Sequence, residues 1–336
     1  MNVTDNRHVR PDAVAPGVSV VIPAFNAGAT IERALDSVGA QTCDGIAEVI
    51  VVDDGSTDGT SDIVREKYPH VILVEQENAG VSAARNAGAI RANCEWVAFL
   101  DADDEWLPQK LEVQMEFAAA CPGAALLLCE EITVPVGGAP QERPGRAGLT
   151  QYTFRDWLTG RAVRAGASLS CSGWLMRRAC FDALSGFDET LGNCEDFELA
   201  LRTAASGYVT AAIPRGLFLK HMQVESVSQG PRSQIRRAEA ACRVVRTYDP
   251  DNVGNGQALL AEDEYPQVLR FYLTHLLYHL LRGGEEHRAV EVADELRRMR
   301  GGRTRSALAG LVCRWPGVSG AAVRRVLHPL RSIRRS

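Results

Sequence analysis

The sequence predicts a three-layer α/β/α fold in which a mainly parallel central sheet lies between helices, followed by a C-terminal helical extension. Two observations predict the layered part. Short, β-branched apolar runs alternate with stretches whose apolar residues recur at helical spacing, and turns rich in Gly, Asn and Asp separate them. A third observation predicts the extension, because only amphipathic helices are expected beyond about residue 230.

Four buried strands are expected in the first hundred residues, at positions 18–23, 49–52, 71–74 and 96–100. Apolar spacing predicts a helix over residues 31–38, and a small-residue helix from Asn78 to about Ala92 carries Arg85 and Asn86. Strands that alternate with helices form right-handed crossovers and parallel pairs. The polar turns after the first, second and fourth strands should therefore gather along one edge of the sheet.

The next hundred residues continue the alternation less regularly. We expect, in order, a helix over 107–115, a strand over 124–128, a surface loop over 137–148, a strand over 172–176, and a short helix and turn over 181–187. An amphipathic helix then begins near Glu195 and Asp196. Acids in a first helical turn are often only complements to the helix dipole, so this pair alone indicates no particular function.

The C-terminal part is predicted to form helices over residues 235–246, 268–281 and 287–299, the last two joined as a hairpin at residues 283–284. His275 and His279 have the spacing of a zinc pair, but Leu276 stands where the H-E-x-x-H pattern has Glu. We therefore interpret these two histidines as part of a packed or solvated helix face.

Composition sets limits on the class of protein. The chain has 336 residues, of which 46% are hydrophobic, and its net charge of -5 argues against nucleic-acid binding. Its nine cysteines form no C-x-x-C pair and are expected to be reduced thiols. No signal peptide and no apolar run of membrane-spanning length is found. These features predict a cytoplasmic protein.

The C-terminus is strongly basic, with eleven Arg and no Asp or Glu between Arg297 and Ser336. Basic amphipathic segments favour anionic membrane surfaces, so this tail would allow peripheral binding at the inner face of the plasma membrane. A solvated tail or a contact in a homo-oligomer is slightly favoured, because Pro316, Gly317 and Pro329 interrupt any long helix.

Three carboxylates follow the fourth expected strand. Residues 96–100 are apolar and lead directly into Asp101, Asp103 and Asp104. Ligands of open α/β sheets bind at this end of the strands, and closely spaced carboxylates repel each other unless a cation lies between them. The sequence therefore indicates a Mg²⁺ or Mn²⁺ site. The alternative is a solvated Asp-rich loop in which Asp104 caps the next helix.

Five segments together resemble a known family. Residues 18–26, 51–59, 78–88, 100–104 and 195–196, in that order, resemble the family 2 glycosyltransferases with the nucleotide-sugar-binding GT-A (Rossmann-like) fold. The resemblance covers roughly residues 18–228 and implies an inverting transfer of a sugar, by a hexosyltransferase-type enzyme, from a nucleoside diphosphate to a hydroxyl group.

The resemblance also implies a domain organisation. A flexible N-terminus, residues 1–17, precedes a GT-A domain over 18–229, with a nucleotide-binding half at 18–104 and an acceptor-binding half at 105–229. A helical extension over 230–300 and a basic tail over 301–336 follow. The implied donor is a UDP-sugar by default, with thymidine and guanosine diphosphate sugars as alternatives. The implied acceptor is a hydroxyl of a glycan, a glycolipid or a secondary metabolite, and a lipid-linked acceptor would suit the basic tail.

Residue by residue, the resemblance implies donor contacts from Pro23, Ala24, Phe25, Asn26, Asp54, Gly80, Arg85, Asp101, Ala102 and Asp103. Asp54 would accept the imide N–H of uracil, since a carboxylate only accepts hydrogen bonds. Arg85 would donate to the base or the diphosphate, which a guanidinium fork suits. Asp101 would meet the ribose hydroxyls or assist the metal.

The resemblance further implies a metal centre and a base. Asp103 would hold the Mn²⁺ or Mg²⁺, which neutralises charge on the departing diphosphate. Asp196 is implied as the general base for the acceptor hydroxyl, and Glu195 as a residue that orients the site. His221 is weighed about evenly between a metal ligand or phosphate donor and an ordinary surface or capping residue.

Other classes fit the sequence less well. A nucleotidyltransferase acting on sugar phosphates usually has a Gly-rich, basic loop after its first strand, whereas residues 23–26 carry no basic side chain. A phosphohydrolase would place the D-x-D motif after its first strand. A dinucleotide oxidoreductase would need G-x-G-x-x-G, which is absent. A catalytically silent module of the same fold remains as the alternative that only an assay can decide.

Overall fold

A computed structural model describes residues 15–141, 150–164, 168–222, 230–249 and 264–299 of the chain. The chain divides into two compact units, Met1–Val224 and Glu225–Ser336. The basic tail expected at 301–336 and most of the N-terminus expected at 1–17 lie outside the described residues.

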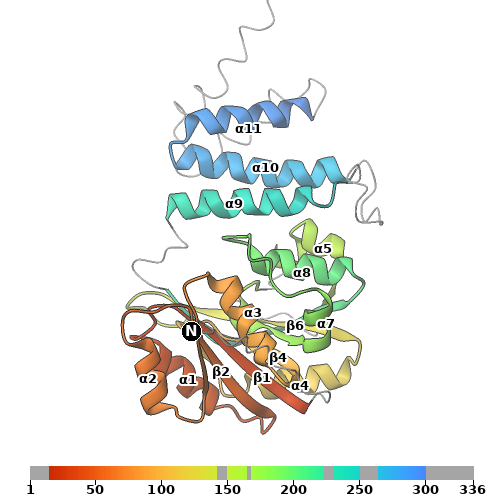
Figure 1. The fold of residues 1–336 in the computed structure, drawn as a ribbon. Coiled ribbons are helices and arrows are strands. Elements are labelled where there is room, and N and C mark those ends of the chain that lie inside the picture. The colour runs from red at the N-terminus through yellow and green to blue at the C-terminus, as the bar shows by residue number, and fades with distance from the viewer. Residues whose placement is uncertain (1–14, 142–149, 165–167, 223–229, 250–263, 300–336) are drawn as a thin grey trace, which may run out of the picture. The chain divides into compact units, whose positions relative to one another are not determined.

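The first unit is built on a mixed sheet (Figure 1). Its strands are β1 (Ala15–Ala24), β2 (Ile46–Asp53), β3 (Ile72–Glu75), β4 (Cys94–Phe99), β5 (Glu105–Trp106), β6 (Ala124–Val134), β7 (Thr150–Tyr152), β8 (Leu175–Arg177) and β9 (Val209–His221). They follow the order β3-β2-β1-β4-β8-β6-β9-β5, with β7 beside β9. The first four strands are mutually parallel, and β6 is parallel to β9, while β5, β7 and β8 run antiparallel to their neighbours. The predicted α/β fold with a mainly parallel sheet is confirmed.

Helices cover both faces of this sheet. The first unit contains α1 (Ile31–Gly39), α2 (Thr60–Lys67), α3 (Val81–Arg91), α4 (Lys110–Ala120), α5 (Phe154–Leu158), α6 (Arg161–Arg164), α7 (Arg178–Ala183) and α8 (Glu195–Ala205), with a 3-10 turn η1 at Cys171–Gly173. Apolar residues of α1, α2 and α4 share one core with the strands. The helix α3 packs on β1 and β2, α7 on β4 and α8 on β9.

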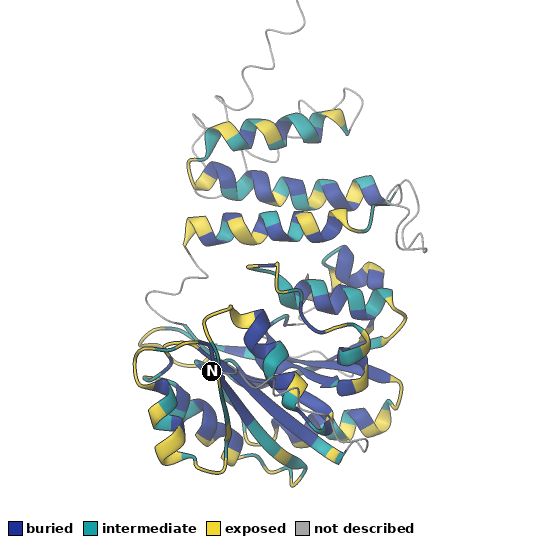
Figure 2. Ribbon diagram, viewed as in Figure 1, coloured by how far each residue is buried: buried dark blue, intermediate teal, exposed yellow. Residues whose placement is uncertain are grey.

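The strand β1 contains the apolar run expected at 18–23, and its side chains are buried on both faces of the sheet (Figure 2). Val20 and Ile22 belong to the core that includes α1. Val21 points to the other face, where a Cβ added to Gly88 of α3 would lie 2.3 Å from a Val21 methyl carbon. Only glycine at position 88 lets the helix approach the strand this closely. This contact sets the position of α3, which carries Arg85.

Two expected elements differ from the structure. The strand expected over 172–176 begins only at Leu175, because Ser172 and Gly173 form the η1 turn, and the Gly173 carbonyl accepts a bond of 2.9 Å from the Gln114 side chain. The short helix expected over 181–187 instead occupies Arg178–Ala183. The long strand β9 was not expected as such, since Pro214 and Gly216 interrupt its sequence pattern and its pairing with β6.

The second unit contains the three expected helices, α9 (Pro231–Arg246), α10 (Tyr265–Arg282) and α11 (Glu286–Arg298). The helix α10 packs against both others, and α10 and α11 form the predicted hairpin with Gly284 at φ 76°. Arg246 of α9 pairs with Glu295 of α11 at 2.8 Å. Among the helices that the structure describes, none has the length and apolar character needed to cross a membrane.

Candidate functional site

The turns after β1 and β2 are bonded to each other at the carboxyl edge of the sheet. The backbone N–H of Asn26 donates to the Ser56 hydroxyl at 2.8 Å, and that of Gly28 donates to the Asp58 carboxylate at 2.8 Å. Asn26 adopts φ 49°, a conformation that asparagine tolerates better than most residues. The prediction that these turns gather at one edge is confirmed.

Asp54 lies directly after β2 and is only 3% exposed. Its carboxylate accepts bonds of 2.8 Å from the side-chain amide of Gln76 and from the backbone N–H groups of Ala79 and Gly80. Gly80 precedes α3 with φ 93°. In this structure Asp54 therefore fixes the turn that opens α3, and about one of its four lone-pair sites is left for the expected contact with a base.

Ser172 forms two hydrogen bonds with the acidic loop after β4. The Ser172 hydroxyl donates to the Asp104 carboxylate at 2.6 Å and accepts from the Asp101 backbone N–H at 3.1 Å. Asp104 is 2% exposed, and burial together with the neighbouring Asp101 raises its pKa well above the usual value. Asp104 does not cap the next helix, which starts at Lys110. It is instead a buried anchor of the loop.

Asp101 and Asp103 differ in their electrostatic surroundings. Burial raises the pKa of Asp101, but the Arg85 guanidinium, with smaller contributions from Lys220 and Ser172, more than offsets this effect, so the net pKa is lowered. For Asp103, burial and the Asp101 carboxylate raise the pKa, and Lys220 and Arg33 lower it only in part. The two carboxylates thus repel each other, and Asp101 has the guanidinium partner.

Arg85 connects the two acidic motifs. Its Nη2 donates to Asp101 at 2.7 Å and its Nη1 donates to Glu195 at 2.9 Å. The Arg85 side chain is 5% exposed and its guanidinium lies over the Phe187 ring, 5.4 Å from the centroid. The side-chain amide of the neighbouring Asn86 donates to the Phe187 carbonyl oxygen and accepts from the Phe187 backbone N–H. One buried cation therefore bonds to acids of both motifs, of which Glu195 lies 110 positions further along the chain.

Cys171 lies near acids of both motifs. Burial raises the pKa of the Cys171 thiol well above its ordinary value, and the Arg85 cation offsets part of that rise. The carboxylates of Asp196, Asp101 and Glu195 raise it further. One buried thiol is thus within electrostatic range of acids from both motifs. The convergence of the Asp101 region and Asp196 on one cleft stays a prediction.

Glu195 and Asp196 form the first turn of α8, after Cys194 at φ 65°. The Phe197 backbone N–H donates to the Asp196 carboxylate at 2.6 Å. A helix N-terminus and a donated N–H both favour the anionic form of a carboxylate. Asp196 therefore lies at the positive end of the α8 dipole.

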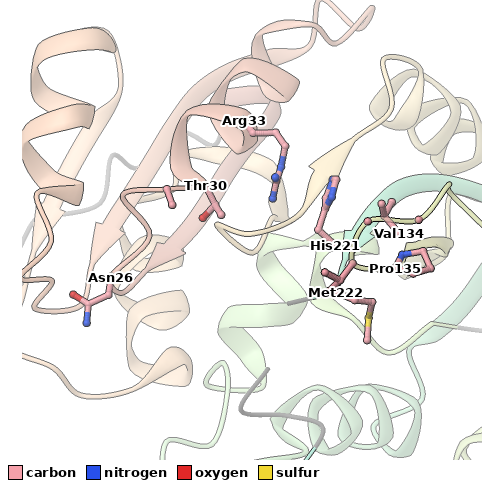
Figure 3. Close-up of a pocket in the computed structure, with 11 residues that line it drawn as sticks. Asn26, Thr30, Arg33, Val134, Pro135, His221 and Met222 are labelled. Atoms are coloured by element: carbon pink, nitrogen blue, oxygen red, sulfur yellow. The ribbon is translucent and has the colours of Figure 1, made fainter. Parts of the chain in front are cut away.

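His221 lies at the end of β9, and its Nε2 is 3.1 Å from the Glu105 carboxylate. Together with Asn26 and Arg33 it lines a cavity of about 490 Å³ (Figure 3). Arg33 reaches the acidic loop from α1, because its Nη2 donates to the Asp103 backbone oxygen at 2.6 Å.

The described residues contain no group of three or more His, Cys, Asp and Glu side chains that could hold a metal ion. His221 is therefore not joined to Asp101 and Asp103 in such a group. Carboxylates are nevertheless donors that Mg²⁺ and Mn²⁺ prefer, and Mg²⁺ often takes one or two carboxylates together with substrate phosphates. The repulsion between Asp101 and Asp103 fits a cation that completes its ligands with the donor.

The other expected donor residues vary in exposure. Pro23 and Ala24 end β1, Ala24 is buried, and Phe25 is 53% exposed beyond them. Ala102 is buried within the acidic loop. Four residues near the acids were not predicted from the sequence: Arg33, Cys171, Ser172 and Lys220. Lys220 could have been found because it precedes His221 in the sequence. Arg33, Cys171 and Ser172 belong to no motif that would have indicated them.

Known proteins resemble this chain in sequence and in fold. The model of glycosyl transferase family 2 matches residues 19–179. The chain belongs to this family. An uncharacterized glycosyltransferase, YibD of Escherichia coli (strain K12), is 44% identical over 104 residues, 30% of each chain. Succinoglycan biosynthesis protein ExoO of Rhizobium meliloti (strain 1021) is 31% identical over 231 residues, 66% of each chain.

The alignments span only part of several family members. They cover 30%, 42% and 30% of the length of three curated relatives. Among solved structures, S. aureus TarS 1–349 in complex with UDP superposes with a TM-score of 0.63 at 20% identity, over 94% of this chain and 91% of TarS. Mannosyltransferase PcManGT from Pyrobaculum calidifontis, in complex with GDP-Man and Mn²⁺, gives a TM-score of 0.54 at 22% identity, over 95% and 91%. These neighbours confirm the expected GT-A fold.

Proposed function

We propose that the protein is an inverting glycosyltransferase that moves a sugar from a nucleoside diphosphate, by default UDP, to a hydroxyl acceptor. The observation that carries this proposal is the Arg85 bridge between Asp101 and Glu195, because it brings the acids after β4 and the acids of α8 into one site. Family membership supports the reaction class. The UDP complex of TarS supports the choice of nucleotide.

Asp196 is the proposed general base. It would accept the proton of the acceptor hydroxyl as that oxygen attacks the anomeric carbon, and the α8 N-terminus favours its anionic form. Glu195, bonded to Arg85, orients the site. Arg85 itself is bonded to two acids in this structure, so we assign it the positioning of both motifs in addition to the expected donor contact.

Asp103 and Asp101 would hold the Mn²⁺ or Mg²⁺ ion. When bound, such an ion neutralises the charge that develops on the departing diphosphate. The PcManGT complex contains Mn²⁺, which supports this choice of cation. Asp54, Phe25 and Asn26 are the proposed contacts of the nucleoside, at the edge formed by the β1 and β2 turns.

The remaining assignments extend this proposal. Residues 18–104 would bind the nucleotide and residues 105–229 the acceptor, with the helices over 230–300 as a separate extension. The basic residues over 301–336 would bring a lipid-linked acceptor at an anionic membrane surface within reach. The chain would then act in the cytoplasm or at the inner face of the plasma membrane.

Activity with purified full-length protein tests the proposal. We would screen nucleotide sugars with and without Mn²⁺ by thermal shift, then measure transfer and the anomeric configuration of the product by NMR. Asp196→Asn should preserve donor binding and lower turnover by about 10²-fold or more, the loss expected for a general base. Asp62→Asn, at an exposed position on α2, is the control. Retention of configuration, or near-normal turnover of Asp196→Asn, would contradict the mechanism.

A further inference from the structure

Two histidines on α10 meet at their ring nitrogens. His275 and His279 are four positions apart on this helix, and their Nε2 atoms lie 3.1 Å from each other. Their ring centroids are 4.6 Å apart. Residues at this spacing are neighbours on one face of an α-helix, but their side chains converge only in particular rotamers. The sequence indicates a packed or solvated helix face, and the structure adds a direct contact between two potential metal ligands.

The distance between the two nitrogens matches that of two ligands on one metal ion. Zinc binds histidine nitrogen at about 2.0–2.1 Å, so two nitrogens 3.1 Å apart would subtend about 95–102° at a shared ion. This angle lies between the right angle of an octahedral site and the wider angle of a tetrahedral one. Little movement of either ring is therefore needed for both nitrogens to bind the same ion.

Both imidazoles are neutral near pH 7. Partial burial lowers the pKa of His275. Burial, together with the neighbouring His275 and Arg282, lowers the pKa of His279 to about 4. Neutral imidazole is the form of histidine that binds metal ions. The protonation of the pair therefore agrees with its geometry.

The packing of α10 keeps the pair accessible. This helix packs against both α9 and α11 (Figure 1). Leu276 and Leu280, each of which follows one of the histidines in the sequence, are 6% and 1% exposed. These buried leucines fix the rotation of α10, whereas His275 is exposed and His279 is partly exposed. An ion in solution can therefore reach both rings.

We propose that His275 and His279 bind one divalent transition-metal ion of the kind that prefers nitrogen ligands, such as Zn²⁺ or Cu²⁺. No third His, Cys, Asp or Glu of the described residues joins them in a group that could hold a metal, so water would complete the coordination. The bound ion would link two successive turns of α10 and stabilise the helix that packs on both of its neighbours.

This site is separate from the proposed transfer reaction. The acidic loop offers the carboxylate oxygens of Asp101 and Asp103, which suit Mg²⁺ and Mn²⁺. The α10 pair offers imidazole nitrogens, which suit Zn²⁺ and Cu²⁺. The two sites can therefore be tested independently, and failure of one leaves the other standing.

A hydrogen bond between the two rings is the alternative explanation of their contact. In that case one Nε2 donates to the other and the pair binds no metal. Arg282 separates the two explanations, because its positive charge contributes to the lowered pKa of His279. A cation at this position repels a bound metal ion but has no comparable effect on a hydrogen bond between neutral rings. Removal of the Arg282 charge should therefore strengthen metal binding.

The experiment measures Zn²⁺ binding to full-length protein by calorimetry, in excess Mg²⁺, which fills oxygen sites and competes poorly for imidazole nitrogen. The variants are His275→Gln, His279→Gln and Arg282→Met. His287→Gln is the matched control, because the His287 side chain is 91% exposed on α11 and has an i,i+4 neighbour, Glu291, at 3.7 Å. EPR spectra of the wild type with Cu²⁺ count the nitrogen ligands. Circular dichroism without metal reports whether each variant keeps its helices.

We expect His275→Gln and His279→Gln each to bind Zn²⁺ about tenfold or more weakly than the wild type, since a single imidazole then holds the ion. Arg282→Met should bind up to about fivefold more tightly, the range for an exposed pair of charges. His287→Gln should bind as the wild type does, and the Cu²⁺ spectrum should show two nitrogen ligands.

Three results would overturn the proposal. The first is wild-type protein without saturable Zn²⁺ binding, or with an affinity that neither His275→Gln nor His279→Gln reduces. The second is a Cu²⁺ spectrum with a single nitrogen ligand. The third is weaker Zn²⁺ binding by Arg282→Met, since loss of a nearby positive charge cannot weaken the binding of a cation at this site.

Discussion

The buried Arg85 bridge gives the sharpest test of how the site is held together. Arg85→Met removes the cation shared by Asp101 and Glu195 and leaves a side chain of similar length over the Phe187 ring. The Asp101 side chain is 27% exposed and that of Glu195 is 14% exposed, so water solvates neither fully once the cation is lost. Breaking a buried ion pair by removing one partner costs about 3–5 kcal/mol.

This free energy can be measured as a thermal shift. For a domain of this size, 1 kcal/mol shifts the Tm by about 2–4 °C, so Arg85→Met should lower the Tm of the first unit by roughly 6–20 °C. Arg65→Met is the control, because Arg65 also pairs with two acids but its side chain is 53% exposed. Exposed pairs contribute about 0–1 kcal/mol, so this variant should unfold close to the wild type.

The activity of Arg85→Lys completes the test. Lysine keeps the charge but presents a single ammonium where Arg85 presents two separate nitrogens to two carboxylates. This variant should recover part of the stability and little of the transfer activity. An Arg85→Met protein that unfolds within about 1 kcal/mol of the wild type, the range of an exposed pair, would refute the view that this bridge is a structural centre of the site.

Three further predictions address the metal, a buried lysine and the helix α3. Asp103→Ala should abolish Mn²⁺-dependent UDP binding, and unchanged calorimetric affinity would refute the metal assignment. Burial lowers the pKa of Lys110 to about 7, so the unfolded chain holds this proton at higher pH than the folded one. Wild-type stability should therefore rise between about pH 7 and pH 10 by up to about 1.4 kcal/mol per pH unit, and Lys110→Met should remove this contribution in denaturant titrations at several pH values. Gly88→Ala would place a Cβ 2.3 Å from a Val21 methyl carbon and should cost about 1–3 kcal/mol in denaturant unfolding, whereas Gly192→Ala, with open space around it, should be neutral.

The sheet could be predicted from the sequence because its first four strands are short apolar runs that end in polar turns. The same pattern places the turns of Asn26, Asp54 and Asp101 at one edge, since parallel strands share their carboxyl ends. The η1 turn at Cys171–Gly173 could not be predicted in this way. It replaces the start of an expected strand because Ser172 bonds to the acidic loop and Gly173 bonds to Gln114.

The partners of Arg85 were also beyond sequence reasoning. Position in a motif indicated that Arg85 belongs to the site, and a donor contact was the natural expectation for a guanidinium there. Its bond to Glu195 depends on where α8 lies relative to α3, which follows from the order of strands β4, β8, β6 and β9. That order comes from long-range antiparallel and parallel pairs that leave no local pattern. The same applies to Arg33, whose partner Asp103 lies 70 residues away.

The carboxylates of the site outnumber the one cation, Arg85, that bridges its two acidic motifs. Asp101, Asp103, Glu195 and Asp196 provide four carboxylates, and Arg85 binds one member of each pair. A donor diphosphate would add further negative charge at the same edge, so its binding needs positive charge from outside the Arg85 bridge. A divalent cation held by Asp101 and Asp103 would supply that charge. Removal of the cation with a chelator should therefore weaken the binding of UDP more than the binding of uridine, which carries no phosphate.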